Sequence, residues 1–249
     1  YTTASIVNES DCEIILVGDS LGMIMLGYNT TVPVTVDDMI HHIRPVVKGA
    51  PDTFIIGDMP FGSYNVSVEQ AIESANRILM ETNCDAVKLE GGKDMAPAVE
   101  SMVKAGISVV GHIGLTPQTS VSFGGFKVQG GTPESAVALI EDAKALEAAG
   151  AIGIVVECVP SVVAKAMTEA VSIPIMGIGA GPDVDAQVMV TQDLLGMYGD
   201  FKPKFVKHFA NIREEMIKGL NEFHTESLSG AFPTPEFSFN KAIELPRVY

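Results

Sequence analysis

The chain has 249 residues, and its 16 lysines and arginines against 31 aspartates and glutamates give a formal net charge of −15. Such a charge argues against nucleic-acid and anionic-membrane partners, because no basic surface is available to displace counterions from phosphates. A hydrophobic content of 47% excludes a disordered chain. No apolar run approaches the roughly 20 residues of a membrane span. The sequence therefore predicts a globular protein that acts on small molecules.

The three cysteines are odd in number and widely spaced: Cys12, Cys84 and Cys158. This pattern is typical of reduced, mostly buried thiols. No secretory signal opens the chain, so we expect a cytoplasmic protein. Because the first residue is Tyr1 rather than methionine, we expect the true start to be missing or removed.

Short apolar runs recur along the chain, each ending in a small or chemically active residue. They are apolar on both faces, which is typical of buried parallel strands. A seventh strand over Ala186–Val190 is possible, although that segment suits a helix equally well. The six clear runs are Glu13–Asp19, Phe54–Asp58, Ala86–Glu90, Ser108–His112, Gly153–Glu157 and Ile173–Ile178.

Helix patterns lie between these runs. A helix over 37–47 contains Pro45, which we expect to kink or shorten it. Further helices are predicted after a capping box that begins at Ser67 and after the N-cap Thr132. An amphipathic pattern over Phe205–Phe223 predicts a long helix near the end of the chain.

Strand ends near residues 19, 58, 90, 112, 157 and 179 are on average about 32 residues apart, the length of one βα unit. This alternation predicts a parallel sheet, either a (β/α)₈ TIM barrel or a doubly wound sheet. We favour the barrel, because it brings the ends of all strands to one mouth, whereas an open sheet spreads them along an edge. We expect a single domain over 1–249 with a C-terminal tail over about 225–249.

Three carboxylates, Asp19, Asp58 and Glu90, end three of the predicted strands. In a barrel they would converge, and they could not all stay ionised without a counter-charge. Oxygen ligands favour Mg²⁺ or Mn²⁺ over zinc as that charge. For any one of these acids alone, a helix cap or a surface position is the simpler interpretation. Three in the same register favour a metal site.

Four more residues close or follow these strands. Lys88 points to the same side as Glu90, as either a cation for substrate or half of a structural salt bridge. His112 is either a donor to a substrate oxygen or a satisfied core histidine. Glu157, between valines and a cysteine, suits a general base near neutral pH, although it could instead partner Lys88. Ser20 could bind a ligand or cap a turn.

Eight sequence blocks follow one another along the chain: Ile15–Gly22, Pro33–His42, Gly57–Ser63, Val87–Gly92, Gly111–Gln118, Gly125–Gly130, Val156–Pro160 and Ile178–Pro182. Together, and in this order, they resemble those of the ketopantoate hydroxymethyltransferase family. Upstream of Tyr1, members of that family carry a first barrel strand that is apparently absent from this sequence. Residues Thr119–Phe123 and Gly131 also differ from the family pattern.

The resemblance implies a Mg²⁺-dependent (β/α)₈ barrel of pantothenate biosynthesis that forms homo-oligomers of ten subunits. In the implied reaction, the enolate of 3-methyl-2-oxobutanoate attacks the one-carbon unit of 5,10-methylenetetrahydrofolate, which gives ketopantoate and tetrahydrofolate. The resemblance assigns Mg²⁺ to Asp19, Asp58 and Glu90, substrate binding to Asp19, Ser20, Asp58 and Lys88, and catalysis to Glu157, Lys88 and His112.

Two other functions remain open on the residues alone. One is a different Mg²⁺-dependent enolate enzyme, such as a lyase acting on small 2-oxo acids. The other is a non-catalytic barrel that binds a metal or a metabolite. Loss of the base or of the metal ligands would mark that second case, yet Glu157 and all three acids are present.

Overall fold

A computed structural model describes residues 1–198 and 203–244. The chain divides into two compact units, Tyr1–Met189 and Val190–Tyr249. The elements are α1 (Thr2–Asn8), β1 (Ile14–Val17), α2 (Leu21–Ile24), α3 (Val36–Gly49), β2 (Phe54–Asp58), α4 (Val68–Thr82), β3 (Ala86–Glu90), η1 (Lys93–Met95), α5 (Ala96–Lys104), β4 (Val109–Gly114), η2 (Pro117–Phe123), α6 (Pro133–Ala148), β5 (Gly153–Glu157), α7 (Ser161–Ala170), β6 (Ile175–Ile178), β7 (Ala186–Gln187), α8 (Thr191–Leu194), α9 (Ile212–Ser229) and η3 (Pro235–Phe237).

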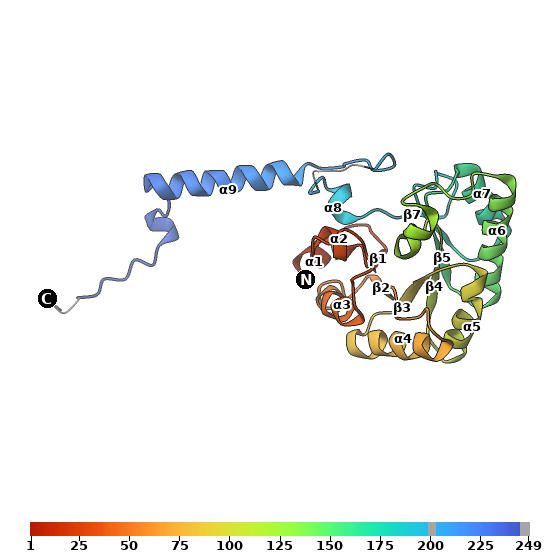
Figure 1. Cartoon of the computed structure of the whole chain (residues 1–249). Helices are drawn as coiled ribbons and strands as arrows, with labels where there is room; N and C mark the ends of the chain where they lie inside the picture. Colours follow the sequence, from red (N-terminus) through yellow and green to blue (C-terminus); the bar gives the residue numbers. More distant parts are fainter. Residues whose placement is uncertain (199–202, 245–249) are drawn as a thin grey trace. The chain divides into compact units, whose positions relative to one another are not determined.

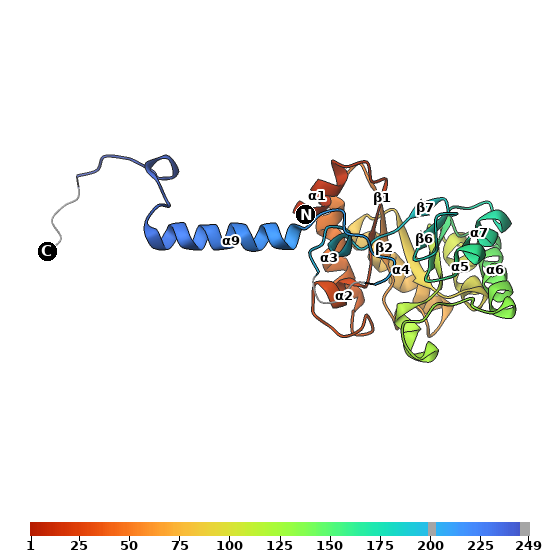
Figure 2. The ribbon, with the colours of Figure 1, turned by 90° about the horizontal axis from the view of Figure 1, so that it is seen from above.

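The first unit is built on one parallel sheet, to which the described residues contribute seven strands in the order β1-β2-β3-β4-β5-β6-β7. Each strand pairs with the next one along the chain, as in a barrel, whereas a doubly wound sheet reverses its order at a switch point. Figure 1 shows the strands at the centre of this unit, with α3, α4, α5, α6 and α7 around the outside. The view from above agrees, with α3 and α6 on opposite sides of the strands (Figure 2).

This arrangement confirms the predicted α/β architecture of the TIM-barrel type, with one strand fewer than eight among the described residues. All six clear strands are present. The ambiguous segment after residue 185 contributes the two-residue strand β7, which pairs with β6. The seventh run is therefore a strand and not a helix.

Side chains on the central strands alternate between two environments. Val87, Leu89 and Val109 belong to the hydrophobic cluster that packs the sheet against its helices. Since successive strand residues point to opposite faces, Lys88 and His112 point to the inner face. The outer face holds the fold together, and the inner face carries the polar chemistry.

The helices begin where their caps predict. Ser67 Oγ accepts the Gln70 N–H at 3.2 Å before α4, and Thr132 caps α6 with Pro133 at its first position. The expectation that Pro45 shortens its helix is wrong, because α3 continues to Gly49. Proline removes one helical N–H, and this loss is offset by a capping box at Thr35 and by the buried face of α3.

The second unit contains α8, α9 and η3. The predicted helix from Phe205 begins only at Ile212, because the Phe209 N–H bonds to Leu194 O at 2.8 Å and draws the preceding backbone away from helical geometry. At its other end α9 reaches Ser229, so the first residues of the expected tail are helical. Gly230, in the left-handed region at φ 74°, ends it. No described residue of α9 is buried.

Two further expectations concern thiols and membranes. All three cysteines are free, but only Cys84 is buried, while Cys12 is exposed and Cys158 is half-buried. The expectation of mostly buried thiols is therefore wrong for Cys12. None of the helices in the described parts of the chain combines the length and hydropathy that a bilayer crossing requires.

Candidate active site

The candidate site lies at the carboxyl ends of the first five strands. Because the strands are parallel, these ends lie at the same edge of the sheet, where barrel enzymes place their chemistry. Asp58, Glu90 and Glu157 are the last residues of β2, β3 and β5, His112 lies within β4, and Asp19 follows β1 by two residues. The structure thus brings together the acids, the lysine and the histidine that the sequence analysis named.

Strand register sets the first contacts. Asp58 and Lys88 are direct partners across β2 and β3, and Glu90 and His112 are partners across β3 and β4. Lys88 Nζ lies 2.9 Å from Asp58 Oδ1, with both side chains almost completely buried. His112 Nδ1 lies 3.3 Å from Glu90 Oε1. Partners in a parallel sheet share a face, so this register places opposite charges together.

His112 links the two halves of the site. Its Nδ1 lies 3.4 Å from Lys88 Nζ, and its Nε2 lies 3.3 Å from Glu157 Oε2. Burial and Lys88 favour a low pKa for His112, but the contacts of the ring with Glu157 and Glu90 outweigh them and raise its pKa to about 9. The ring is therefore a cation near neutral pH. Its buried Nε2 faces Glu157 Oε2 as an ion pair, although among the described residues this atom has no aligned hydrogen bond.

Burial and neighbouring charges shift the pKa values of the clustered acids and of Lys88. Burial raises the pKa of Asp19 to about 8, and the nearby Asp58 carboxylate adds to the effect. Burial also raises the pKa of Asp58, against the pull of the Lys88 ammonium. For Glu90 burial acts in the same direction, but contact with His112 outweighs it and lowers the pKa. Burial opposes the charge on Lys88, yet the three acids together raise its pKa.

The oxygens around Asp58 suit a hard divalent cation. Asp58 Oδ2 accepts the Asp19 N–H at 3.0 Å, while Oδ1 is buried without an aligned hydrogen bond inside the described structure. No three His, Cys, Asp or Glu side chains among the described residues are arranged to share one ion. Mg²⁺ normally keeps several waters and takes only one or two protein carboxylates, so Asp19 and Asp58 fit such an ion.

Two residues that the sequence analysis missed tie the carboxylates together. Gln118 Nε2 donates to Asp19 Oδ2 at 2.9 Å, and the Gln118 N–H donates to Glu90 Oε2 at 3.1 Å. Tyr64 OH donates to Gln118 Oε1. Both residues lie outside the strands, so strand periodicity does not mark them. The available signal was that Gln118 ends the Gly111–Gln118 block.

Ser20 and Cys158 shape the edges of the site. Ser20 is half-buried and precedes α2, but its hydroxyl makes no cap bond to that helix, so it is available to a ligand. Directly after Glu157, the chain turns at Cys158, which adopts the left-handed region at φ 48°. Burial and the Glu157 charge raise the pKa of the Cys158 thiol to about 11. This thiol is therefore protonated and unreactive at neutral pH.

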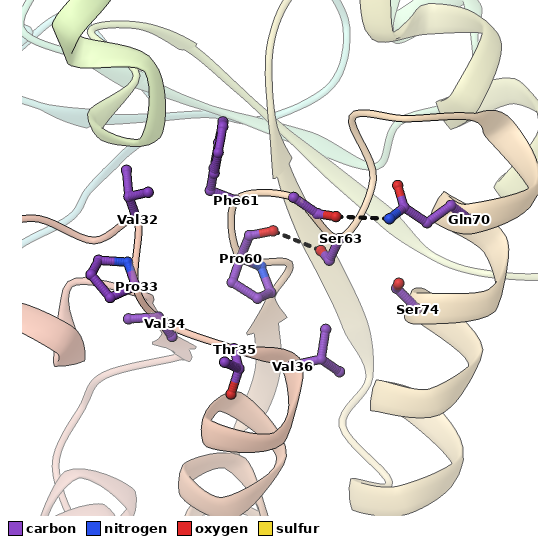
Figure 3. Close-up of a pocket in the computed structure, with 11 residues that line it drawn as sticks. Val32, Pro33, Val34, Thr35, Val36, Pro60, Phe61, Ser63, Gln70 and Ser74 are labelled. Atoms are coloured by element: carbon purple, nitrogen blue, oxygen red, sulfur yellow. Dashed lines mark hydrogen bonds between the residues drawn. The ribbon is translucent and has the colours of Figure 1, made fainter.

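A separate pocket of about 350 Å³ lies beside the loop that follows β2 (Figure 3). Ser63 Oγ donates to Pro60 O at 2.7 Å, and Gln70 Nε2 donates to Gly62 O at 2.8 Å, which holds the loop against α4. None of the site carboxylates belongs to the pocket lining. Its walls are Val32, Pro33, Val34, Thr35, Val36, Pro60, Phe61, Gly62, Ser63, Gln70 and Ser74.

Solved structures share this fold at low sequence identity. Phosphonopyruvate hydrolase, in a complex with oxalate and Mg²⁺, has a TM-score of 0.58 at 11% identity, with 94% of this chain and 84% of that chain covered. A 2,3-dimethylmalate lyase of the PEP mutase/isocitrate lyase superfamily has a TM-score of 0.55 at 13% identity, with the same coverage of 94% and 84%. At such identities the likeness establishes the fold alone.

Sequence relatives are much closer. The 3-methyl-2-oxobutanoate hydroxymethyltransferase of Heliobacterium modesticaldum is 57% identical over 249 residues, which cover 100% of this chain and 90% of the relative. The enzyme of that name from Enterococcus faecalis is 51% identical over 239 residues, 96% of this chain and 87% of the relative. The model of the family described as ketopantoate hydroxymethyltransferase matches residues 1–235. Because this match runs through the whole first unit and most of the second, the chain belongs to the ketopantoate hydroxymethyltransferase family.

Proposed function

We propose that this chain is a 3-methyl-2-oxobutanoate hydroxymethyltransferase of pantothenate biosynthesis. It would join 3-methyl-2-oxobutanoate to the one-carbon unit of 5,10-methylenetetrahydrofolate, which gives ketopantoate and tetrahydrofolate. The observation that carries the proposal is the 57% identity to an enzyme of that name over the full chain. The buried cluster of acids, lysine and histidine supplies the chemical groups that the reaction needs.

Asp19 and Asp58 would hold Mg²⁺, with Glu90 acting through water. Both oxygens of Glu90 already have protein partners, the His112 ring and the Gln118 N–H. Asp58 Oδ1 is paired with the Lys88 ammonium at 2.9 Å, but it is a buried oxygen without an aligned hydrogen bond in the described part of the chain. When bound, the cation supplies Lewis-acid polarisation of the keto and carboxylate oxygens of the substrate.

Glu157 would take the proton from C3 of the keto acid. It ends β5, and its side chain is 17% exposed, so it reaches substrate better than the buried acids do. The contact of its Oε2 with His112 Nε2 orients the carboxylate. Its partner is His112, while Lys88 is paired with Asp58, which disfavours the alternative interpretation of Glu157 as a structural partner of Lys88.

Lys88 and His112 would stabilise negative charge as it develops on the keto oxygen or rests on the substrate carboxylate. Both are cationic near neutral pH, and both are buried, where a fixed charge acts more strongly than in water. Lys88 also serves structurally through its ion pair with Asp58. Ser20 would donate a hydrogen bond to the substrate from the turn after β1.

The bonds that change are few. C3 of the keto acid loses its proton to Glu157 and forms a carbon–carbon bond to the methylene carbon. Both bonds from that carbon to the two folate nitrogens break, and water supplies the new hydroxyl group. Each nitrogen gains one proton, and these two protons balance the one lost from C3 and the one lost from water. The cofactor is released as tetrahydrofolate, so neither an oxidant nor a reductant is required.

The test is formation of ketopantoate from the purified protein, keto acid and methylenetetrahydrofolate, followed by NMR. We expect product only when all three are present, loss of product with EDTA and recovery with Mg²⁺. A lyase of small 2-oxo acids would cleave substrate without folate. A non-catalytic barrel would bind ligand without turnover. Either result would overturn the proposed function.

Assembly and location belong to the same proposal. We expect a homo-oligomer, with ten subunits by family resemblance, in the cytoplasm. Exposed apolar side chains on α9, among them Leu220 and Phe223, support association. Light scattering that shows a particle of only 26.4 kDa at micromolar concentration would exclude it.

A further inference from the structure

Gln118 is a buried amide in η2 whose polar atoms are all engaged. Its Nε2 donates to Asp19 Oδ2 and to Met59 O, both at 2.9 Å. Its Oε1 accepts the hydroxyl of Tyr64, and its backbone N–H donates to Glu90 Oε2 at 3.1 Å. Through its side chain and its backbone N–H, this one residue therefore contacts groups that follow or end three different strands.

Only one orientation of this amide satisfies its surroundings. Met59 O is a carbonyl and can only accept, so the Gln118 atom beside it must be the NH₂ group. The Glu90 N–H donates to Tyr64 OH at 3.2 Å, which leaves the single hydroxyl hydrogen of Tyr64 for Gln118 Oε1. A flipped amide would set its oxygen against Asp19 Oδ2 and Met59 O, so acceptors would face acceptors.

The fixed amide in turn fixes a carboxylate. Gln118 holds Asp19 Oδ2, and the Asp19 N–H is held by Asp58 Oδ2 at 3.0 Å. Asp19 Oδ1 receives no hydrogen bond from the described residues. It is also not one of their fully buried polar atoms without a hydrogen-bond partner, so it is not closed off from a ligand. Asp19 is thus presented with one oxygen engaged and the other available.

We propose that Tyr64 and Gln118 form a positioning pair that orients Asp19 for its cation. Tyr64 sets the amide of Gln118, and Gln118 sets the carboxylate. Neither residue touches the reacting atoms. The inference rests on the proposed function in that it takes Asp19 as a cation ligand. Hydrogen-bonded outer partners of metal ligands typically change metal affinity by about 10–100-fold when removed.

The experiment is a double-mutant cycle on Mg²⁺ affinity, measured by calorimetry in the presence of 3-methyl-2-oxobutanoate. Gln118→Met removes the amide at similar length. Tyr64→Phe removes only the hydroxyl and keeps the buried ring, so this variant should retain the fold even if Gln118→Met does not. Gln70→Met and Tyr28→Phe make the same replacements outside the site and are the controls; Gln70 lies in α4, and Tyr28 is an exposed residue after α2. Gln70 also makes two local bonds, to Gly62 O and from the Val66 N–H.

We expect each site variant to raise the Kd for Mg²⁺ about tenfold or more. The double variant should be no weaker than Gln118→Met alone, because the hydroxyl acts through the amide. The controls should leave the Kd unchanged, although Gln70→Met should lower the thermal midpoint. A purely structural pair would lower the midpoint of the site variants and leave their Kd unchanged, which would overturn the proposal.

Additive effects, with the double variant about a hundredfold weaker, would show that the two side chains act independently and would also overturn the proposal. The proposed function and the positioning pair can be refuted independently of each other. A wild-type protein that binds Mg²⁺ but forms no ketopantoate refutes the reaction, while a tenfold loss in Tyr64→Phe would still support the pair. Normal product formation with unchanged Kd in Tyr64→Phe refutes the pair alone.

Discussion

Replacing Lys88 with methionine is expected to destabilise the protein strongly at pH 8. The ammonium lies 2.9 Å from Asp58 Oδ1, and both side chains are at most 4% exposed. Removing one member of a buried ion pair leaves the other charge without a partner, which typically costs about 3–5 kcal/mol. For a protein of this size, such a loss lowers the thermal midpoint by roughly 6–20 °C.

The cost should shrink as the pH falls. Burial already raises the pKa of Asp58, and loss of the ammonium raises it further. A carboxyl whose folded pKa lies above its unfolded value binds extra protons when folded, so the variant gains stability as the pH falls through the folded pKa. As Asp58 takes up a proton in the variant, the unpaired charge is removed.

Urea unfolding of wild type and variant at pH 8 and pH 5 measures both effects. Lys104→Met is the matched control, because Lys104 makes an exposed ion pair with Glu100 and should change the midpoint little. The reasoning is refuted if Lys88→Met costs no more than Lys104→Met. It is also refuted if its cost grows toward pH 5.

Three other predictions concern the same cluster. The affinity for Mg²⁺ should rise with pH up to about 8 and then level off, because the pKa of Asp19 is about 8 and the ion displaces its proton. Calorimetry at pH 6, 7 and 8 should detect a release of protons on binding that declines as the pH rises. Asp58→Asn should weaken Mg²⁺ binding at least tenfold by the same titration, and unchanged affinity would remove Asp58 from the metal site. Turnover should fall above pH 9 as His112, with a pKa of about 9, loses its positive charge; a pH–rate profile that stays level to pH 10 would contradict this.

The inner polar face of the sheet could be predicted from residue order alone. Lys88 and Glu90 are two residues apart on one strand, which places both side chains on one face, and the structure has both buried there. Which partner each of them meets depends on strand register. Asp58 is opposite Lys88 because β2 and β3 pair with Ile56 opposite Ala86. No local sequence pattern predicts this register.

The missed features lie where periodicity gives no information. Gln118 lies in the short helix η2 and Tyr64 in the loop after β2, and their role appears only when three strands are assembled. The aromatic spacing from Phe205 suits a helix over its full length, but a backbone bond from Phe209 to Leu194 competes with the first turns. Tertiary contacts decided both outcomes.

The claim that Glu157 takes the C3 proton of the bound keto acid is the centre of the mechanism. NMR of 3-methyl-2-oxobutanoate in deuterated water, with Mg²⁺ and without folate, measures that step directly. Glu157→Gln fills the same space as a neutral amide and should still bind Mg²⁺ and substrate. We predict that C3 exchange at saturating substrate falls about 10²–10⁴-fold in this variant, the usual contribution of a positioned general base. Exchange at the wild-type rate in the saturated variant would show that another group takes the proton.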